Sequence, residues 1–268
     1  MLTSFFSLLI FGCLTGVTTV LFGFGGGFIT VPVIYGVLTA TARPGADAMH
    51  VAVATSAAVM VVNAVVATSA QWRQGRLRSA YLWPLAGFIA IGACAGSFAA
   101  TLVGGTALRL LFTAYLLVTI TDSLLRKGFL SVAHQIPAKS LDRGTTTLGG
   151  MGIGLVAAAL GVGGSVMTVP LLRRRGLLMA EATAMANPLS VPVAVAGTLV
   201  YALAPTAASG AGQFGYVHVP AGAALLVGSL PTIAVMRRVT GRVPDRVHSA
   251  AYVVLLLVVL IVMVTMGI

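Results

Sequence analysis

Residues 23–32 read GFGGGFITVP, and residues 161–170 read GVGGSVMTVP, in a chain of 268 residues. We call these two stretches the first and second glycine phrase. The same spacing also pairs Gly12 with Gly150 and Gly16 with Gly154. The repeated residues are mostly glycine, threonine and proline, and glycine and proline dictate backbone shape more strongly than any other residue. The sequence therefore predicts two halves that share one backbone design.

The composition decides the environment of the chain. Hydrophobic residues make up 58% of the sequence and charged residues only 8%, and the mean hydropathy is +1.04. A soluble fold could not bury this much apolar surface within itself. We therefore expect an all-α polytopic membrane protein.

Long apolar stretches divide the chain into two sets of five segments. The first set covers residues 3–22, 28–41, 50–69, 82–101 and 108–125, and the second covers 147–160, 165–172, 184–204, 219–236 and 247–267. A helix needs about 20 residues to cross a hydrocarbon core of about 30 Å, and the segments beside the glycine phrases are shorter. They are expected to be half-helices or re-entrant hairpins. The predicted organisation is a first membrane repeat over residues 1–125, a cytoplasmic linker over 126–145 and a second membrane repeat over 146–268.

The basic residues test how the chain crosses the membrane, because cytoplasmic loops collect Lys and Arg. If each glycine phrase sends the chain back, one face receives all of the 16 basic residues except Arg43 and Arg109. If each phrase is only a kink in a spanning helix, the basic residues divide seven against nine. The reversal is favoured, and it places both termini on the periplasmic or extracellular side. Five segments per half then imply inverted-topology repeats, as in many secondary transporters.

The glycine phrases have two interpretations. Glycines break helices and allow close approach, and each Thr-Val-Pro is expected to end a short segment by removing a backbone donor. The half-helices that begin near Phe28 and Val166 would present free N–H groups and positive dipole ends, which suit a small anion. The alternative is close helix packing, which we favour for the glycine pairs at four-residue spacing. Those pairs are Gly12 and Gly16, Gly92 and Gly96, and Gly150 and Gly154.

Candidate substrate-binding residues come from both phrases and from the segment that follows each of them. Hydroxyl and amide groups there lie at matching depths near the start of a long helix, although Ser and Thr in membrane helices often bond their own backbone. The residues are Gly25, Gly26, Gly27, Thr30, Gly163, Gly164, Ser165, Thr168, Thr55, Ser56, Asn187 and Ser190.

Ionisable groups are nearly absent from the apolar segments. Asp122 lies four residues before Arg126, which favours an interfacial ion pair within one helix. His50, His218 and His248 begin or flank predicted spans, where they could relay protons, although anchoring at the membrane interface is the better interpretation.

The duplicated Gly-x-Gly-Gly with Thr-Val-Pro, in two related halves, resembles the sulfite exporter family typified by the TauE and SafE proteins. The resemblance extends over essentially the whole chain. It implies a bacterial inner-membrane transporter of small sulfur-containing anions, such as sulfite or an organosulfonate such as sulfoacetate, usually for export. The chain departs from the pattern at Ser165, which corresponds to Gly27, and in the run of arginines at 173–175.

Three functions follow in order of preference. The first is a secondary transporter in which the two glycine phrases bind a small anion and one repeat moves against the other. The second is a passive anion channel, and the third is an intramembrane enzyme, for which the sequence offers no nucleophile with a base at plausible depth. The expected partners are the anion and membrane lipid, with a homo-oligomer left open. No cofactor, metal or nucleic acid is expected.

Overall fold

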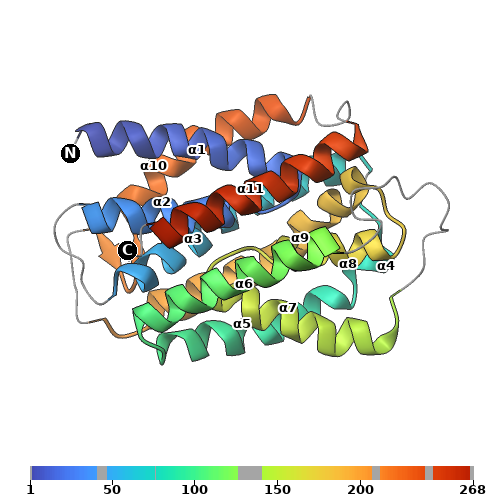
Figure 1. Cartoon of the computed structure of the whole chain (residues 1–268), viewed down its shortest axis with the longest axis horizontal. Coiled ribbons are helices and arrows are strands. Elements are labelled where there is room, and N and C mark those ends of the chain that lie inside the picture. The colour runs from blue at the N-terminus through green and yellow to red at the C-terminus, as the bar shows by residue number, and fades with distance from the viewer. Residues whose placement is uncertain are drawn as a thin grey trace.

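The computed structural model describes residues 2–40, 47–75, 77–125, 141–206, 212–238 and 244–265, and shows a helical membrane protein (Figure 1). The first half contains α1 (Leu2–Phe22), α2 (Gly27–Ala40), α3 (Ala48–Arg73), α4 (Ser79–Leu82), α5 (Leu85–Thr101) and α6 (Gly105–Leu125). The second half contains the π-helix η1 (Thr145–Gly149), α7 (Gly150–Leu160), α8 (Ser165–Arg174), α9 (Met179–Leu203), β1 (Gln213–Phe214), β2 (Val217–His218), α10 (Val219–Met236) and α11 (Asp245–Thr265).

The predicted segments correspond closely to these helices. Among the described residues, α3, α6, α9, α10 and α11 are each long and apolar enough to cross a membrane. The helices that follow the glycine phrases are much shorter, with 14 residues in α2 and 10 in α8. At about 1.5 Å per residue, neither reaches across a hydrocarbon core of about 30 Å.

One local prediction was wrong. The Thr-Val-Pro sequences do not end their segments, because Pro32 lies inside α2 and Pro170 lies inside α8. Each proline is the sixth residue of its helix, so it removes one backbone bond near the start and leaves the following turns intact. In a membrane protein, neighbouring helices can satisfy the one backbone group that a proline frees. They could not satisfy all the free backbone groups of an open strand or loop in lipid. The glycines, rather than the prolines, set the boundaries of these helices.

The two halves are interlocked. The helix of the first apolar segment of each half packs against the helix of the fourth apolar segment of the other half, so α1 lies along α10 and α7 lies along α5. Glycines line both interfaces: a β-carbon built on Gly12 would lie 2.4 Å from the Leu225 carbonyl oxygen, and one built on Gly96 would lie 2.0 Å from that of Leu155. This confirms the packing interpretation of the glycine pairs.

The half-helices end near opposite ends of α6. Tyr35, in α2, accepts a hydrogen bond from Arg109 near the start of α6. Arg174, in the last turn of α8, instead pairs with Asp122 near the end of α6. The start of α1 and the end of α11 lie at the same end of the bundle (Figure 1). The reversals at the glycine phrases, the inverted repeats and the domain boundaries stay predictions, and most of the predicted linker lies outside the described residues.

Candidate functional site

The two glycine phrases meet inside the bundle. A β-carbon built on Gly27 would lie 2.6 Å from the carbonyl oxygen of Gly161, and one built on Gly163 would lie 2.9 Å from that of Phe24. Ser56, in the first half of α3, is the side chain that joins them. Its hydroxyl lies 2.9 Å from the Gly27 carbonyl oxygen and 2.7 Å from the Gly161 carbonyl oxygen, so one proton is shared between both phrases.

This junction brings two helix N-termini together. α2 begins at Gly27 and α8 begins at Ser165, and the first N–H groups of a helix have no partner within it. Each N-terminus carries a partial positive charge of about half an elementary charge. Phe28, Ser165 and Val166 are fully buried at these starts. The structure therefore concentrates positive potential at one place without placing a cationic side chain there.

The predicted hydroxyl groups divide into two kinds. Some are engaged by the protein: Thr30 Oγ1 donates to the Gly26 carbonyl at 2.9 Å, and Ser190 Oγ donates to the Ala186 carbonyl at 2.9 Å. Thr55 Oγ1 accepts a hydrogen bond of 2.9 Å from the backbone N–H of His218. These three hydroxyls hold helices and the β1–β2 hairpin in place.

The other kind has no hydrogen-bond partner among the described residues. Ser165 Oγ and Thr168 Oγ1 are both buried and unpaired on α8, close to its N-terminus. Asn187, on α9, donates through Nδ2 to the Thr19 carbonyl at 3.3 Å, whereas its Oδ1 is unpaired. Unpaired buried polar groups are costly, so they point to a ligand or water at this place.

Sequence reasoning missed two residues at this junction. Asn63 of α3 is fully buried, and a β-carbon built on Gly26 would lie 2.9 Å from its Nδ2. Met60 lies one turn earlier, and its sulfur would be 2.9 Å from a β-carbon on Gly163 and 3.3 Å from one on Gly27. The spacing Ser56, Met60 and Asn63 places all three on one face of a helix, which was a usable signal.

The positive residues at 173–175 are bound by carboxylates from three other parts of the chain. Arg173 pairs with Asp245 at 2.8 Å, Arg174 with Asp122 at 2.6 Å, and Arg175 with Asp142. Hydrogen bonds from Thr145 hold the pKa of the Asp142 carboxyl well below its ordinary value. The predicted partner of Asp122, Arg126, lies outside the described residues. The arginine run therefore fixes the end of α8 to its neighbours.

The side chains of His50, His218 and His248 each lie within hydrogen-bond distance of a backbone group. His50 Nε2 lies 3.1 Å from the Ala100 carbonyl oxygen, and His248 Nε2 contacts the Leu21 carbonyl oxygen. His218 Nδ1 accepts from the N–H of Ala221 and caps α10. Within the described part of the chain, no group of three His, Cys, Asp or Glu side chains could hold a metal ion. These contacts favour anchoring roles for the histidines.

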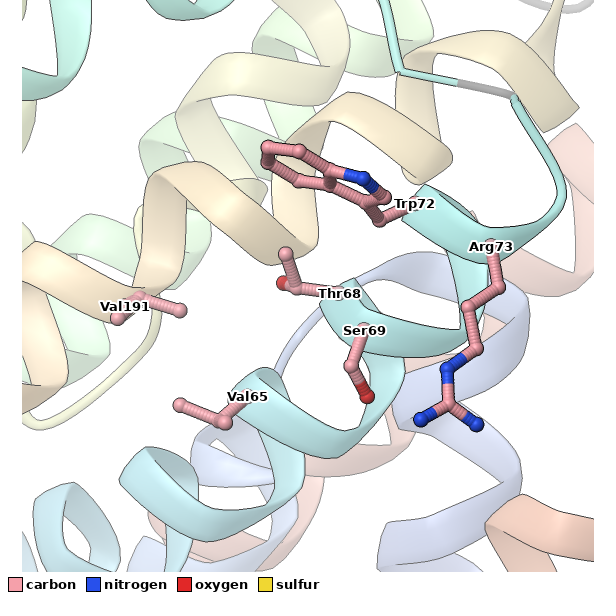
Figure 2. A pocket seen from close by; sticks show the side chains of 6 residues that line it. All are labelled: Val65, Thr68, Ser69, Trp72, Arg73 and Val191. Atoms are coloured by element: carbon pink, nitrogen blue, oxygen red, sulfur yellow. The ribbon is translucent and has the colours of Figure 1, made fainter.

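A surface groove of about 370 Å³ lies between α3 and α9, away from the glycine phrases (Figure 2). The indole of Trp72 extends over it toward α9, whereas the guanidinium group of Arg73 points away from Val191. Val65 and Val191 make its wall apolar, and none of the predicted site residues lines it. The groove therefore offers little to an anion.

Comparison with known proteins decides the family. The family model for sulfite exporter TauE/SafE matches residues 8–263. The chain belongs to the sulfite exporter TauE/SafE family. A "probable membrane transporter protein" of Haemophilus influenzae is 25% identical over 261 residues, which cover 94% of this chain and 95% of the relative. No solved structure matches the chain significantly. TauE/SafE proteins are membrane transporters, and the resemblance predicted from the glycine phrases is confirmed.

Proposed function

We propose that the protein is a secondary transporter that exports a small oxyanion, with sulfite or an organosulfonate such as sulfoacetate as substrate. The single observation that carries this proposal is the meeting of the α2 and α8 N-termini between the middle parts of α3 and α9. Membership of the TauE/SafE family supports it. So does the name of the Haemophilus influenzae relative.

The geometry suits an oxyanion better than a cation or a neutral solute. Two helix N-termini direct N–H groups and positive potential to one place. Ser165 and Thr168 add buried hydroxyls that have no hydrogen-bond partner among the residues that the structure describes. Because these donors lie in a low-dielectric bundle, each would contribute more to anion binding than it would in water. Gly25, Gly26, Gly27, Gly163 and Gly164 allow the backbone to approach the substrate closely.

We place the protein in the bacterial inner membrane with its arginine-rich end in the cytoplasm and both termini outside. The positive-inside rule supports this orientation, because the ion-paired arginines Arg78, Arg173, Arg174 and Arg175 gather at one end. Exposed basic side chains there would also contact anionic lipid headgroups. Alternating access would come from the movement of one inverted repeat against the other.

The test is flux in proteoliposomes. We expect saturable sulfite transport with counterflow exchange, and stimulation by a membrane potential, because moving one charge through 100 mV contributes about 2.3 kcal/mol. Ser165→Ala and Thr168→Val should each raise the KM for sulfite about 10- to 100-fold, since each removes a hydrogen bond to a charged group. Neither change should reduce the unfolding temperature, because neither hydroxyl has a hydrogen-bond partner in the described part of the chain.

Matched controls exist for both substitutions. Ser97 is equally buried but donates to the Ala93 carbonyl of its own helix at 2.7 Å. Thr18 is buried and donates to the carbonyls of Leu14 and Thr15. Ser97→Ala and Thr18→Val should leave the KM unchanged. Failure of the wild-type protein to move sulfite, sulfonates, sulfate and carboxylates would contradict the proposal, and flux without saturation or counterflow would favour a channel.

A further inference from the structure

Asn63 is a buried residue whose side-chain NH₂ group has no hydrogen-bond partner in the part of the chain that the structure describes. Its side chain is fully buried, its Oδ1 accepts a hydrogen bond of 2.8 Å from Ser229 Oγ of α10, and its Nδ2 has no partner among the described residues. A hydrogen bond to Oδ1 fixes which way the amide faces, so its NH₂ group is directed away from Ser229. An unpaired buried N–H group is costly, and a site for it is therefore expected nearby.

The NH₂ group faces the first glycine phrase. A β-carbon on Gly26 would lie 2.9 Å from Asn63 Nδ2, 2.2 Å from Thr15 Cγ2 and 3.4 Å from Thr19 Oγ1. Both threonine hydroxyls already donate to backbone carbonyls of α1, to Phe11 at 2.7 Å and to Thr15 at 2.8 Å. Asn63 therefore holds the free side-chain donor of this group, beside the turn that starts α2.

A small cavity of about 30 Å³, lined by residues of α1, α3 and α10, lies on the side of this place nearer the arginine-rich end of the bundle. Its inner wall includes Ala67 and Ile233, which lie one helical turn beyond Asn63 on α3 and Ser229 on α10. Its outer wall includes Gln71 and Arg237. A cavity of this size has room for one or two water molecules. A partly basic cavity large enough for water thus lies about one helical turn from Asn63.

We propose that Asn63 Nδ2 is a specificity-determining donor that binds an oxygen of the transported anion at the first glycine phrase, with Ser229 as the residue that orients it. This inference rests on the proposed function, because it assigns the donor within the same anion site. The α1, α3 and α10 cavity is the route by which the anion reaches Asn63 from the arginine-rich end, and Arg237 attracts it there.

The chemistry of Asn63 restricts the substrate class. An amide NH₂ group donates hydrogen bonds and carries no charge, so it binds an oxyanion without requiring a proton or a counter-ion. The second half has no equivalent amide, because Gly197 corresponds to Asn63 once a loop that is four residues longer in the first half is allowed for after the glycine phrase. Two symmetric helix N-termini alone would place a small anion midway between the phrases. With Asn63 as an additional donor, the anion would bind closer to the first phrase.

The experiment uses the full-length protein in proteoliposomes with sulfite as the probe, together with thermal unfolding in detergent with and without sulfite. Asn63→Leu should raise the KM for sulfite about 10- to 100-fold, while Vmax changes less. The upward shift in unfolding temperature produced by sulfite should disappear. The unfolding temperature without sulfite should be maintained, because Ser229 can donate to the Leu226 carbonyl, which lies 3.4 Å away.

Two further variants keep the test decisive if Asn63→Leu does not fold. Asn63→Asp retains the shape but adds a negative charge, so sulfite transport should fall more steeply than in Asn63→Leu. Ser229→Ala should raise the KM by a smaller factor, because it removes only the residue that orients the amide. Thr18→Val is the control for the loss of a buried polar group, since its hydroxyl bonds only its own helix.

The failures can be told apart. If the wild-type protein transports sulfite and Asn63→Leu or Asn63→Asp retains the wild-type KM, the role of Asn63 is overturned and the proposed function stands. If the wild-type protein neither transports nor is stabilised by any small anion, the proposed function is overturned and the role of Asn63 with it. A wild-type KM in Ser229→Ala would overturn the orienting role of Ser229 alone.

Discussion

The two glycine phrases have nearly the same sequence but stand in different surroundings. The first has glycines at positive φ at Gly23, Gly25 and Gly26, whereas the second has one, Gly161. A β-carbon on Gly26 would meet Thr15 and Asn63, whereas one on the corresponding Gly164 would meet Ile153 and Val193. Duplication has therefore kept the left-handed glycine at the start of each phrase, Gly23 and Gly161, whereas the backbone before each half-helix and the side chains that face Gly26 and Gly164 differ.

The half-helices also differ in how they are held. Thr30 donates to the Gly26 carbonyl, whereas the corresponding Thr168 has no partner among the described residues. The end of α8 is fixed by the three arginine pairs, and one of these, Arg173 with Asp245, is almost fully buried. The contacts between α2 and α6 include no described ion pair; they include a hydrogen bond of 3.4 Å from Arg109 to Tyr35 and the stacking of Phe28 on Phe112 with ring centroids 6.3 Å apart. We infer that α8 is held more firmly at the site and that α2 is the more mobile of the two half-helices.

Removing the anchor of α8 should have the largest effect. The side chains of Arg173 and Asp245 are 3% and 16% exposed, and Asp245 Oδ1 also accepts from the N–H of Met179 at 2.7 Å. Asp245→Ala removes the carboxylate that pairs with this buried cation, so we expect a loss of about 3–5 kcal/mol in the free energy of unfolding. Denaturation in detergent micelles, followed by tryptophan fluorescence, measures it.

The matched change in the other half-helix, α2, is Tyr35→Phe, which removes the hydrogen bond from Arg109. We expect it to cost no more than about 1 kcal/mol, because the bond is long and the groups are only half-buried. Equal losses in Asp245→Ala and Tyr35→Phe would refute the difference in anchoring between the two half-helices.

Alanine at corresponding glycines tests the backbone difference. Gly26 has a φ of +87°, and a β-carbon there would lie 2.2 Å from Thr15 Cγ2. Left-handed strain and overpacking together should cost Gly26→Ala about 2–4 kcal/mol. Gly164 has a φ of −58°, and its β-carbon would lie 3.2 Å from Ile153 Cγ2, so Gly164→Ala should cost less than about 1 kcal/mol.

Unfolding temperatures of the two variants, measured side by side in one detergent, decide the point. Gly26→Ala should unfold at a clearly lower temperature than the wild-type protein, and Gly164→Ala should remain close to it. Should Gly164→Ala prove as unstable as Gly26→Ala, the two turns would be equivalent despite their different geometry.

The sequence was sufficient to predict the helices and the proximity of the two glycine phrases. These predictions depend on the length of the apolar segments and on the glycine clusters, which can be read from short stretches of sequence. It predicted all five segments of each half, including the short α2 and α8. It did not reveal the Asn63 to Ser229 bond or the partners of Arg173 and Arg174, because those contacts join residues 52–166 positions apart. The β1–β2 hairpin was also missed, since its strands have two residues each. Side-chain partners depend on packing between the halves, which a repeated motif does not specify.

Ser56 tests whether the two phrases depend on each other. Its hydroxyl proton is shared between the carbonyls of Gly27 and Gly161, so Ser56→Ala should cost about 1–2 kcal/mol by leaving these buried oxygens without that donor. Ser97→Ala, which removes a bond within one helix, should cost less. Because Ser56, unlike Ser97, bonds to both glycine phrases, its loss should also reduce sulfite counterflow, whereas Ser97→Ala should not. Counterflow that is unchanged in Ser56→Ala would show that the phrases hold their relative position through backbone packing alone, with Gly27 against the Gly161 carbonyl as the decisive contact.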